Sequence, residues 1–334
     1  MAVDNATTNV TNTSLPVYIM NVSYWEQILL AILLELVAIA GLIGNSMIIA
    51  AVAFSKKLQT STNAFVTSLS ITDLLTSFTL IWYTISLLGK NEWPIPGAYW
   101  ICKFTGFMVY ACVGTSMLTL GMIGINRLIH ISKPMWYQKI FTSWKLVILV
   151  LIPWVIPTVS LLISTATGDV AFGYNKPSLV CAVYEHTDLF VIAINAVGLL
   201  FPLLAIVSYS MQSSSADLAI TEEGHDPNHS TAGRRRKQIS KQEIAITKNL
   251  FVVVVGFLVC FLPYLILLSI RNAIDAEHYR FYIRVGPFFN SAINFMIYAS
   301  KHPDFKVVLR HMMRCSYADI PQPSPILKYI LSKN

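Results

Sequence analysis

The sequence predicts an all-α membrane protein, a seven-transmembrane helix bundle with a short amphipathic eighth helix. Two observations predict this fold: the composition is too apolar for a soluble globule, and seven apolar runs are long enough to cross a bilayer. Of 334 residues, 55% are hydrophobic and only 12% are charged, which is about half the charge of an ordinary soluble domain. Such a chain has too little polar surface to coat a water-facing fold.

Each apolar run can span the membrane, because about 30 Å of hydrocarbon requires about 20 helical residues at about 1.5 Å each. The connection 213–243 is Ser-rich, then acidic, then basic, which is typical of a flexible, water-exposed loop. We find no internal repeat, which argues against a transporter. We expect the spans near 25–53, 64–89, 99–130, 145–167, 188–212, 245–270 and 280–300.

The Lys and Arg residues orient the bundle. With the amino terminus outside, 18 of the 24 basic residues fall in cytoplasmic segments and 6 fall outside, as the positive-inside rule requires. The net charge of +7 therefore reflects topology and does not indicate a nucleic-acid partner. The chain divides into an extracellular tail, a bundle, a membrane-surface helix and a cytoplasmic tail, at 1–24, 25–300, 301–315 and 316–334.

Glycosylation sequons support this orientation. Four of them, at Asn5, Asn9, Asn12 and Asn21, crowd into the tail that precedes the first span. A further match at Asn228 lies in the cytoplasmic loop, where glycosylating enzymes do not reach, and we discount it. The amino-terminal tail is therefore expected to be glycosylated.

Five cysteines allow one extracellular pair. Cys102 opens the third span and Cys181 lies in the second outer loop, both on the oxidising side of the membrane, so a disulfide is expected there. Cys112 and Cys260 lie within apolar helices and are expected to pack as small buried side chains. Cys315 follows a short amphipathic stretch and is either a palmitoylation site or an inert thiol.

Asp73 is the clearest polar group at membrane depth. It lies in the middle of the second span, where an ionisable group costs several kcal/mol unless it is paired or hydrated. A cage of hard oxygen ligands would suit a small cation, and a hydrogen-bond network without an ion explains the same residues equally well. The deep positions of other spans supply Asn45, Ser116, Asn290, Ser291 and Asn294.

A set of landmarks carries a family resemblance over roughly residues 25–315. They are Gly44-Asn45, Leu69-Ser70-Ile71-Thr72-Asp73, Cys102, Asn126-Arg127-Leu128, Trp154, Pro202, Cys260-Phe261-Leu262-Pro263, the run from Asn290 to Tyr298, and Phe305. In this order they resemble the class A, rhodopsin-like G-protein-coupled receptors. The resemblance implies a plasma-membrane receptor that binds an extracellular ligand in an outer pocket and activates a heterotrimeric G protein.

The resemblance also implies a role for the polar cage. In this family the cage formed here by Asp73, Ser116, Asn290, Ser291 and Asn294 holds sodium in the resting state, which favours the ion over the bare hydrogen-bond network. A cation that binds one state better stabilises that state and opposes activation. No other cofactor is expected.

The inner switch departs from the family pattern. Asn126 stands where the family usually has an acid beside the arginine, here Arg127. Glu243 stands where many resting receptors place an acid that pairs with that arginine across the helices, although a solvated Glu243 remains the alternative. We therefore predict that Arg127, Glu243 and Tyr298 form the G-protein switch. Phe295 replaces the family's seventh-helix proline, which removes a standard source of a kink.

The nearest subgroup is the melatonin-receptor-like set, to which Gly124-Ile125-Asn126-Arg127 is similar. Those receptors hold their ligand with an asparagine and a glutamine, at positions that correspond here to Ser164 and Glu185, so melatonin is not expected as the ligand. Val109 replaces the aspartate typical of amine receptors, and Phe288 replaces the retinal-binding lysine of opsins. The ligand is therefore expected to be neither a biogenic amine nor retinal.

The expected ligand pocket includes one cation. Arg284 lies about 15 Å above Asn294 on the seventh helix, where it would suit an acidic ligand. An internal ion pair with Glu35, at matching depth on the first helix, is the favoured alternative. The candidate ligand-binding residues are Val109, Tyr110, Val113, Glu185, Phe261, Tyr264 and Arg284.

The sequence argues against two other function classes. An ion-coupled transporter could use Asp73 as its coupling site, but it would need symmetric repeats or a second buried charge relay. An enzyme would need a metal or a nucleophile set, and neither His-Glu-x-x-His nor Gly-x-Ser-x-Gly occurs.

Overall fold

The computed structural model describes residues 22–89, 92–186, 251–266, 282–283 and 285–333. Several sequence predictions lie outside these residues. They are the fifth span at 188–212, the loop 213–243, the sequons at Asn5, Asn9, Asn12 and Asn21, and the side chains of Glu185, Glu243 and Arg284.

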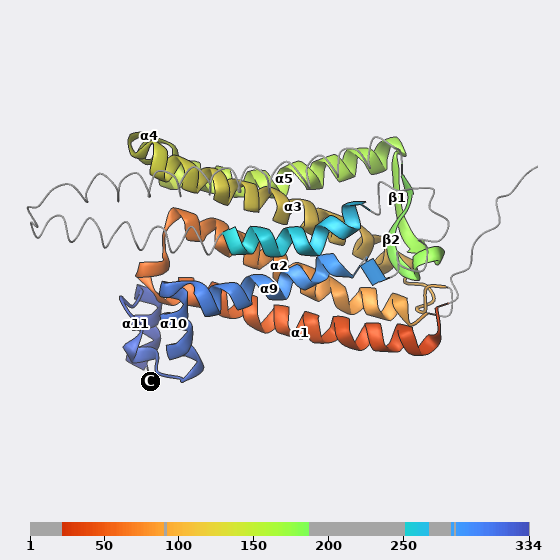
Figure 1. Ribbon diagram of the computed structural model, residues 1–334, viewed down its shortest axis with the longest axis horizontal. Helices are drawn as coiled ribbons and strands as arrows, with labels where there is room; N and C mark the ends of the chain where they lie inside the picture. The colour runs from red at the N-terminus through yellow and green to blue at the C-terminus, as the bar shows by residue number, and fades with distance from the viewer. Residues whose placement is uncertain (1–21, 90–91, 187–250, 267–281, 284, 334) are drawn as a thin grey trace, which may run out of the picture.

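Long helices run side by side through the described part of the bundle (Figure 1). Four of them are long and apolar enough to cross a membrane, and they match the first four predicted spans. A shorter apolar helix, Phe251–Ile266, lies within the predicted sixth span. The four are α1 (Tyr24–Phe54), α2 (Ser61–Leu87), α3 (Tyr99–Ser132) and α5 (Ser143–Thr167).

Local sequence fixes where these helices begin and end. Ser23 and Glu26 form a capping box at the start of α1, which satisfies main-chain N–H groups that have no partner inside the helix. Thr60 caps α2, which begins at Ser61, three residues before the predicted start of the second span. Gly168, at φ 83°, ends α5 in the left-handed conformation that glycine adopts without steric cost.

The described part of the seventh predicted span, 280–300, consists mostly of one helix. Its helix, α9, covers Gly286–Lys301 and carries Pro287 in its first turn. Proline is favoured there because its missing N–H group would have no partner inside the helix. Tyr282 and Ile283 are helical as well, and residues 280, 281 and 284 lie outside the described residues, so the expected start at residue 280 stays a prediction.

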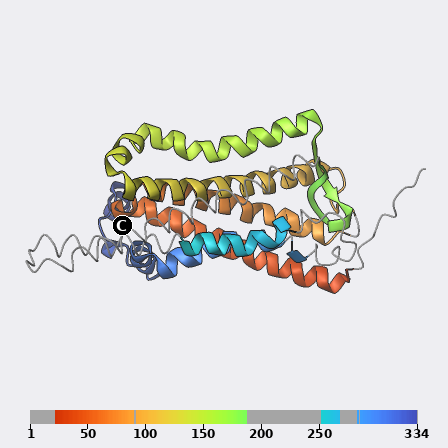
Figure 2. The ribbon, with the colours of Figure 1, turned by 45° about the horizontal axis from the view of Figure 1, so that its top comes forward.

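Two apolar clusters make up most of the core. The inner one joins α1, α2, α3, the Phe251–Ile266 helix, α9 and the carboxyl-terminal helices, and it includes Phe65, Phe257 and Tyr298. The outer one joins α1, α2, α3, α9 and the second outer loop. Only 11% of the most apolar stretch of α5 is buried inside the molecule, and α5 lies along one edge of the bundle in both views (Figures 1 and 2). Its remaining surface is therefore suited to lipid.

The second outer loop forms a β-hairpin that the sequence analysis did not predict. Strands β1 (Val170–Asn175) and β2 (Val180–His186) pair antiparallel, with a one-turn helix, η2 (Lys176–Ser178), between them. The hairpin lies across the outer ends of the helices (Figure 1). It therefore covers the end of the bundle where a ligand is expected.

Short helices occupy the other end of the bundle. The predicted membrane-surface helix corresponds to α10 (Pro303–Met313), and the predicted cytoplasmic tail 316–334 contains two helices. The segment between these two helices bonds to the end of α1, a contact that hydropathy does not reveal. The remaining elements are η1 (Lys56–Leu58), α4 (Pro134–Ile140), η4 (Tyr317–Asp319) and α11 (Pro325–Lys333).

Candidate functional site

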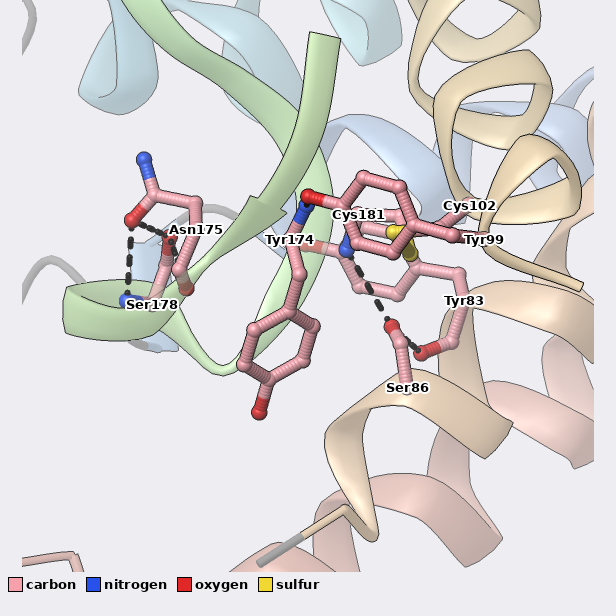
Figure 3. Close-up of a disulfide and its surroundings, with 8 residues drawn as sticks. All are labelled: Tyr83, Ser86, Tyr99, Cys102, Tyr174, Asn175, Ser178 and Cys181. Carbon is pink, nitrogen blue, oxygen red and sulfur yellow. Dashed lines mark hydrogen bonds between the residues drawn. A yellow bond between two sulfur atoms is a disulfide. The ribbon is translucent and has the colours of Figure 1, made fainter. Parts of the chain in front are cut away.

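The disulfide between Cys102 and Cys181 fastens the hairpin to the outer end of α3, as predicted. Both cysteines are fully buried, and their Cα atoms are 5.1 Å apart. The main-chain N–H of Cys181 donates to the Ser86 hydroxyl at 3.2 Å, and that of Tyr174 donates to the Tyr99 hydroxyl at 3.0 Å (Figure 3). The hairpin is thus held to α2 and α3 by one covalent bond and two hydrogen bonds.

The hairpin turn is stabilised by its own side chains. The Asn175 side chain accepts a hydrogen bond from the main chain of Ser178 at 3.2 Å (Figure 3). Burial, and to a smaller degree the nearby carboxylate of Glu92, raises the pKa of Tyr174 to about 12. Tyr174 is therefore neutral at physiological pH.

Two of the predicted ligand-binding residues meet across the bundle. The hydroxyl oxygens of Tyr110, on α3, and Tyr264, on the sixth span, lie 3.1 Å apart and share a hydrogen bond. Phe172, on β1, packs edge-on against Tyr110 with ring centroids 6.0 Å apart. Phe261 is buried and stacks on Phe257 at 4.2 Å. The hydroxyl pair of Tyr110 and Tyr264 therefore lies beside an aromatic ring of the hairpin.

Phe172 was missed by the sequence analysis. A usable signal was present, because the large apolar residues Val170, Phe172 and Tyr174 occupy every second position, at the period of a strand. The hairpin therefore contributes an aromatic ring beside Tyr110 that the list of candidate ligand residues lacked.

The positions that bind amines or retinal in related receptors are apolar here. Val109 is buried in the outer cluster with Tyr83 and Phe288. The rings of Tyr83 and Phe288 are in edge contact at 4.8 Å. Val113, one turn further along α3, packs against the inner cluster, which includes Phe261. The described walls at these positions therefore carry no charge.

Glu35 has a hydrogen-bond donor within the described residues. The Thr84 hydroxyl, on α2, donates to the Glu35 carboxylate. Arg284 lies outside the described residues, so the expected pair between Arg284 and Glu35 stays a prediction.

Asp73 lies at the centre of the polar cage, where it is 1% exposed. The Asn294 amide donates to its carboxylate at 2.9 Å, and the Ser291 hydroxyl also hydrogen-bonds to it. Ser77, one turn further along α2, donates to the main-chain oxygen of Asp73 at 2.7 Å and was not among the predicted residues. Ser116 is also buried. The contacts to Asp73 therefore join α2 to α9.

Three amide oxygens near this cage lack donors. Within the described residues, the side-chain oxygens of Asn45, Asn290 and Asn294 are buried without a hydrogen-bond partner. Buried oxygens of this kind are normally satisfied by a water or a cation. One carboxylate surrounded by neutral oxygens suits a monovalent ion, and no group of three His, Cys, Asp or Glu residues that could hold a metal occurs in the described part. The donor set therefore fits sodium.

Two glycines allow α1 to approach this region. A Cβ atom on Gly41 would collide with the Ser77 hydroxyl, and one on Gly44 would collide with the Phe295 ring. Phe295, which stands in place of the family's proline, thus packs directly against the α1 backbone. Asn45, next to Gly44, donates to the main-chain oxygen of Ser291 at 2.8 Å and so links α1 to α9.

At the inner end of α3, Asn126 stands where the family usually has an acid beside the arginine. The Thr62 hydroxyl, on α2, donates to the Asn126 side-chain oxygen at 2.6 Å, and both residues are buried. Arg127 and Tyr298 are also buried at this end. Glu243, the predicted partner of Arg127, lies outside the described residues. Asn126 therefore serves as a neutral link between α2 and α3.

Comparisons with known proteins agree with this geometry. The 7 transmembrane receptor (rhodopsin family) profile matches residues 44–298. The dopamine D2-like receptor of Drosophila melanogaster is 30% identical over 186 residues, which cover 54% of this chain but only 19% of that receptor. Melatonin receptor type 1B-A of Danio rerio is 27% identical over 267 residues, which cover 79% of this chain and 86% of that receptor.

The solved structures give the same fold. Squid rhodopsin superposes with a TM-score of 0.75 at 20% sequence identity, covering 90% of this chain and 88% of that one. The predicted seven-transmembrane helix bundle is thereby confirmed.

Proposed function

The chain belongs to the rhodopsin family of seven-transmembrane receptors, and from this we propose where its ligand binds and how it switches. As a member of this family it is a multi-pass receptor of the plasma membrane, not an enzyme, and it signals from an extracellular ligand to a heterotrimeric G protein. We place the ligand beneath the hairpin, between α3 and the sixth span.

The contact between the Tyr110 and Tyr264 hydroxyls carries this proposal. It joins α3 to the sixth span at the level of Phe172, so a ligand that replaces this hydrogen bond would change the distance between the two helices. A conformational change requires a ligand that interacts differently with the two states. A ligand that replaces the hydrogen bond between the two hydroxyls would bind the state in which they are separated better than the state in which they are joined.

The proposed ligand is neither a biogenic amine nor retinal. Val109 and Phe288 support this, because both are buried among apolar side chains and neither could form an ion pair or a Schiff base. Relatives named for dopamine and for melatonin are both similar to this chain, so similarity alone selects no ligand. Ser164 and Glu185, in place of the melatonin-binding asparagine and glutamine, argue against melatonin.

Further residues of the outer side remain part of the proposal. Val113, Phe261 and Glu185 would complete the pocket, and Arg284 would either pair with Glu35 or bind an acid of the ligand. Arg284→Gln that loses surface expression, rescued by Glu35→Gln with ligand potency intact, would make the arginine purely structural.

The proposed resting state contains sodium. The buried carboxylate of Asp73 and the unsatisfied amide oxygens of Asn290 and Asn294 support a bound cation, with Ser116 and Ser291 as the remaining candidate ligands. Arg127, Glu243 and Tyr298 are proposed to close the inner face in the same state.

Two modifications are also proposed. Asn5, Asn9, Asn12 and Asn21 would carry glycans on the extracellular tail. Cys315 is exposed directly after α10 and would take a palmitoyl chain.

The test is ligand-stimulated nucleotide exchange on G proteins reconstituted with the receptor. Tyr110→Phe and Tyr264→Phe should each lower ligand potency about tenfold, as expected for a lost hydrogen bond worth about 1.4 kcal/mol. Tyr317→Phe is the matched control, because Tyr317 packs against Phe54 at the inner end of the bundle. Ion flux driven by the same ligands, without nucleotide exchange on any G protein, would favour the transporter that uses Asp73.

A further inference from the structure

The last helix, α11, is fastened to the inner end of α1. Three hydrogen bonds join the segment 321–324 to residues 54–56, and Ser55 and Ser324 are fully buried in this contact. Since α1 leaves the bilayer at this point, the contact holds α11 at the membrane surface. The bonds run from Lys56 N to Gln322 O at 2.9 Å, from Ser324 N to Phe54 O at 2.8 Å and from Ser55 Oγ to Pro321 O at 2.7 Å.

Leu327 anchors α11 to the rest of the protein. Leu327 is 1% exposed and packs in the inner cluster. The Ser324 hydroxyl accepts from the main-chain N–H of Leu327 at 3.2 Å and so caps the start of the helix. α11 is therefore an ordered helix that docks through one edge.

The two sides that flank this docked edge differ in polarity. Ile326, Tyr329 and Ile330 lie on one side, at the spacing of a single helix face, and are 55%, 61% and 40% exposed. Lys328 and Ser332 lie on the other side and are also exposed. Leu331 lies next to the docked edge and is 38% exposed, and Lys333 ends the apolar side beside Tyr329. A helix in water has no need of such an apolar side, whereas a helix at a lipid boundary requires one.

Charge and position favour lipid as the occupant of the apolar side. The chain from residue 320 to its end contains Lys328 and Lys333 and no acidic residue, which suits the anionic inner leaflet. The Lys333 ammonium lies 4.8 Å from the centre of the Tyr329 ring, an aromatic and cationic pair typical of membrane interfaces. The neighbouring α10 also exposes apolar side chains, Val307 at 42% and Met313 at 64%.

We propose that α11 is a second membrane-surface helix, which inserts Ile326, Tyr329 and Ile330 among inner-leaflet lipids and sets Lys328 and Lys333 beside anionic headgroups. A short amphipathic helix binds lipid weakly by itself. The hydrogen bonds to α1 keep α11 next to the membrane. This tether gives α11 a high effective concentration at the lipid surface, so it needs little affinity of its own for lipid in order to insert. This inference is independent of the ligand and of the G protein.

The test uses the full-length receptor in nanodiscs of phosphatidylcholine and phosphatidylserine, in a Cys315→Ser background. The other unpaired cysteines, Cys112 and Cys260, are buried. Nitroxide labels at Ile326→Cys and Ile330→Cys should be accessible to oxygen and protected from a water-soluble nickel complex. Matched labels at Lys328→Cys and Ser332→Cys should show the opposite. Equal nickel accessibility on both sides of the helix would overturn the proposal.

A second measurement separates insertion from simple docking. A label at Tyr329→Cys should become mobile and water-accessible when Ile326 and Ile330 are both changed to Gln. The control variant, Ser332→Ala, should leave that label in lipid. If the label is unaffected by the first pair, or is in water from the start, the apolar side does not bind lipid. If the label lies equally deep in discs of phosphatidylcholine alone, anionic headgroups do not contribute to the binding of α11.

Discussion

Removing the disulfide between Cys102 and Cys181 tests whether the hairpin depends on its covalent link. The perturbation is the double variant Cys102→Ala, Cys181→Ala. Both cysteines are replaced, so that neither partner of the disulfide is left as a free thiol. Among the described residues, the hydrogen bonds to Ser86 and Tyr99 and the buried side chains then hold the hairpin to the helices.

The expected magnitude follows from the length of chain that the bond closes. The cysteines are separated by 79 residues, for which the chain-entropy relation gives about 4.5 kcal/mol. The helices α3 and α5 remain in the membrane when the outer loop unfolds, so the freed chain begins only at Gly168. A loop of about 15 residues corresponds to about 3 kcal/mol, and we expect a destabilisation of that size.

The assay is thermal unfolding of the purified receptor together with its surface expression. A loss of about 3 kcal/mol should lower the melting temperature by roughly 6–12 °C, on the scaling of soluble domains of 150–250 residues. Cys315→Ala is the control, because this exposed thiol makes no disulfide. A double variant that melts and reaches the surface like the wild type would refute the reasoning.

Three further predictions concern the ion site and the inner face. Asp73→Asn should abolish the rise in melting temperature with sodium that a resting-state ion site produces; an equal sodium response in the variant would exclude Asp73 as a ligand. Glu243→Gln should raise ligand-free signalling, because it would remove the proposed pair with Arg127, which belongs only to the closed state; unchanged basal signalling at matched expression would make Glu243 a solvated residue. Burial lowers the pKa of His302 from 6.5 to about 4, so the unfolded chain binds the proton first and stability should fall by about 3 kcal/mol as the pH drops through that interval. His302→Phe should flatten this part of the melting profile, and an unchanged slope would contradict the assignment.

The sequence by itself determined the features that depend on local composition or on topology. Span lengths follow from hydropathy, because every lipid-exposed stretch of backbone must be helical and apolar. Orientation follows from the basic residues. Once the topology is known, Cys102 and Cys181 are the two cysteines left on the oxidising side, which is why their pairing could be predicted. Asp73 stood out because a carboxylate at membrane depth is rare.

Contacts between distant segments were decided only by the tertiary structure. Phe172 was not predicted beside Tyr110, because its position depends on the pairing of β1 with β2 and on their attachment to α3. The bond from Thr62 to Asn126 joins residues 64 positions apart. The sequence likewise gave no sign that Ser324 bonds to the end of α1. Hydropathy and motifs describe each segment alone, whereas these contacts form only when the bundle brings separate segments within hydrogen-bonding distance.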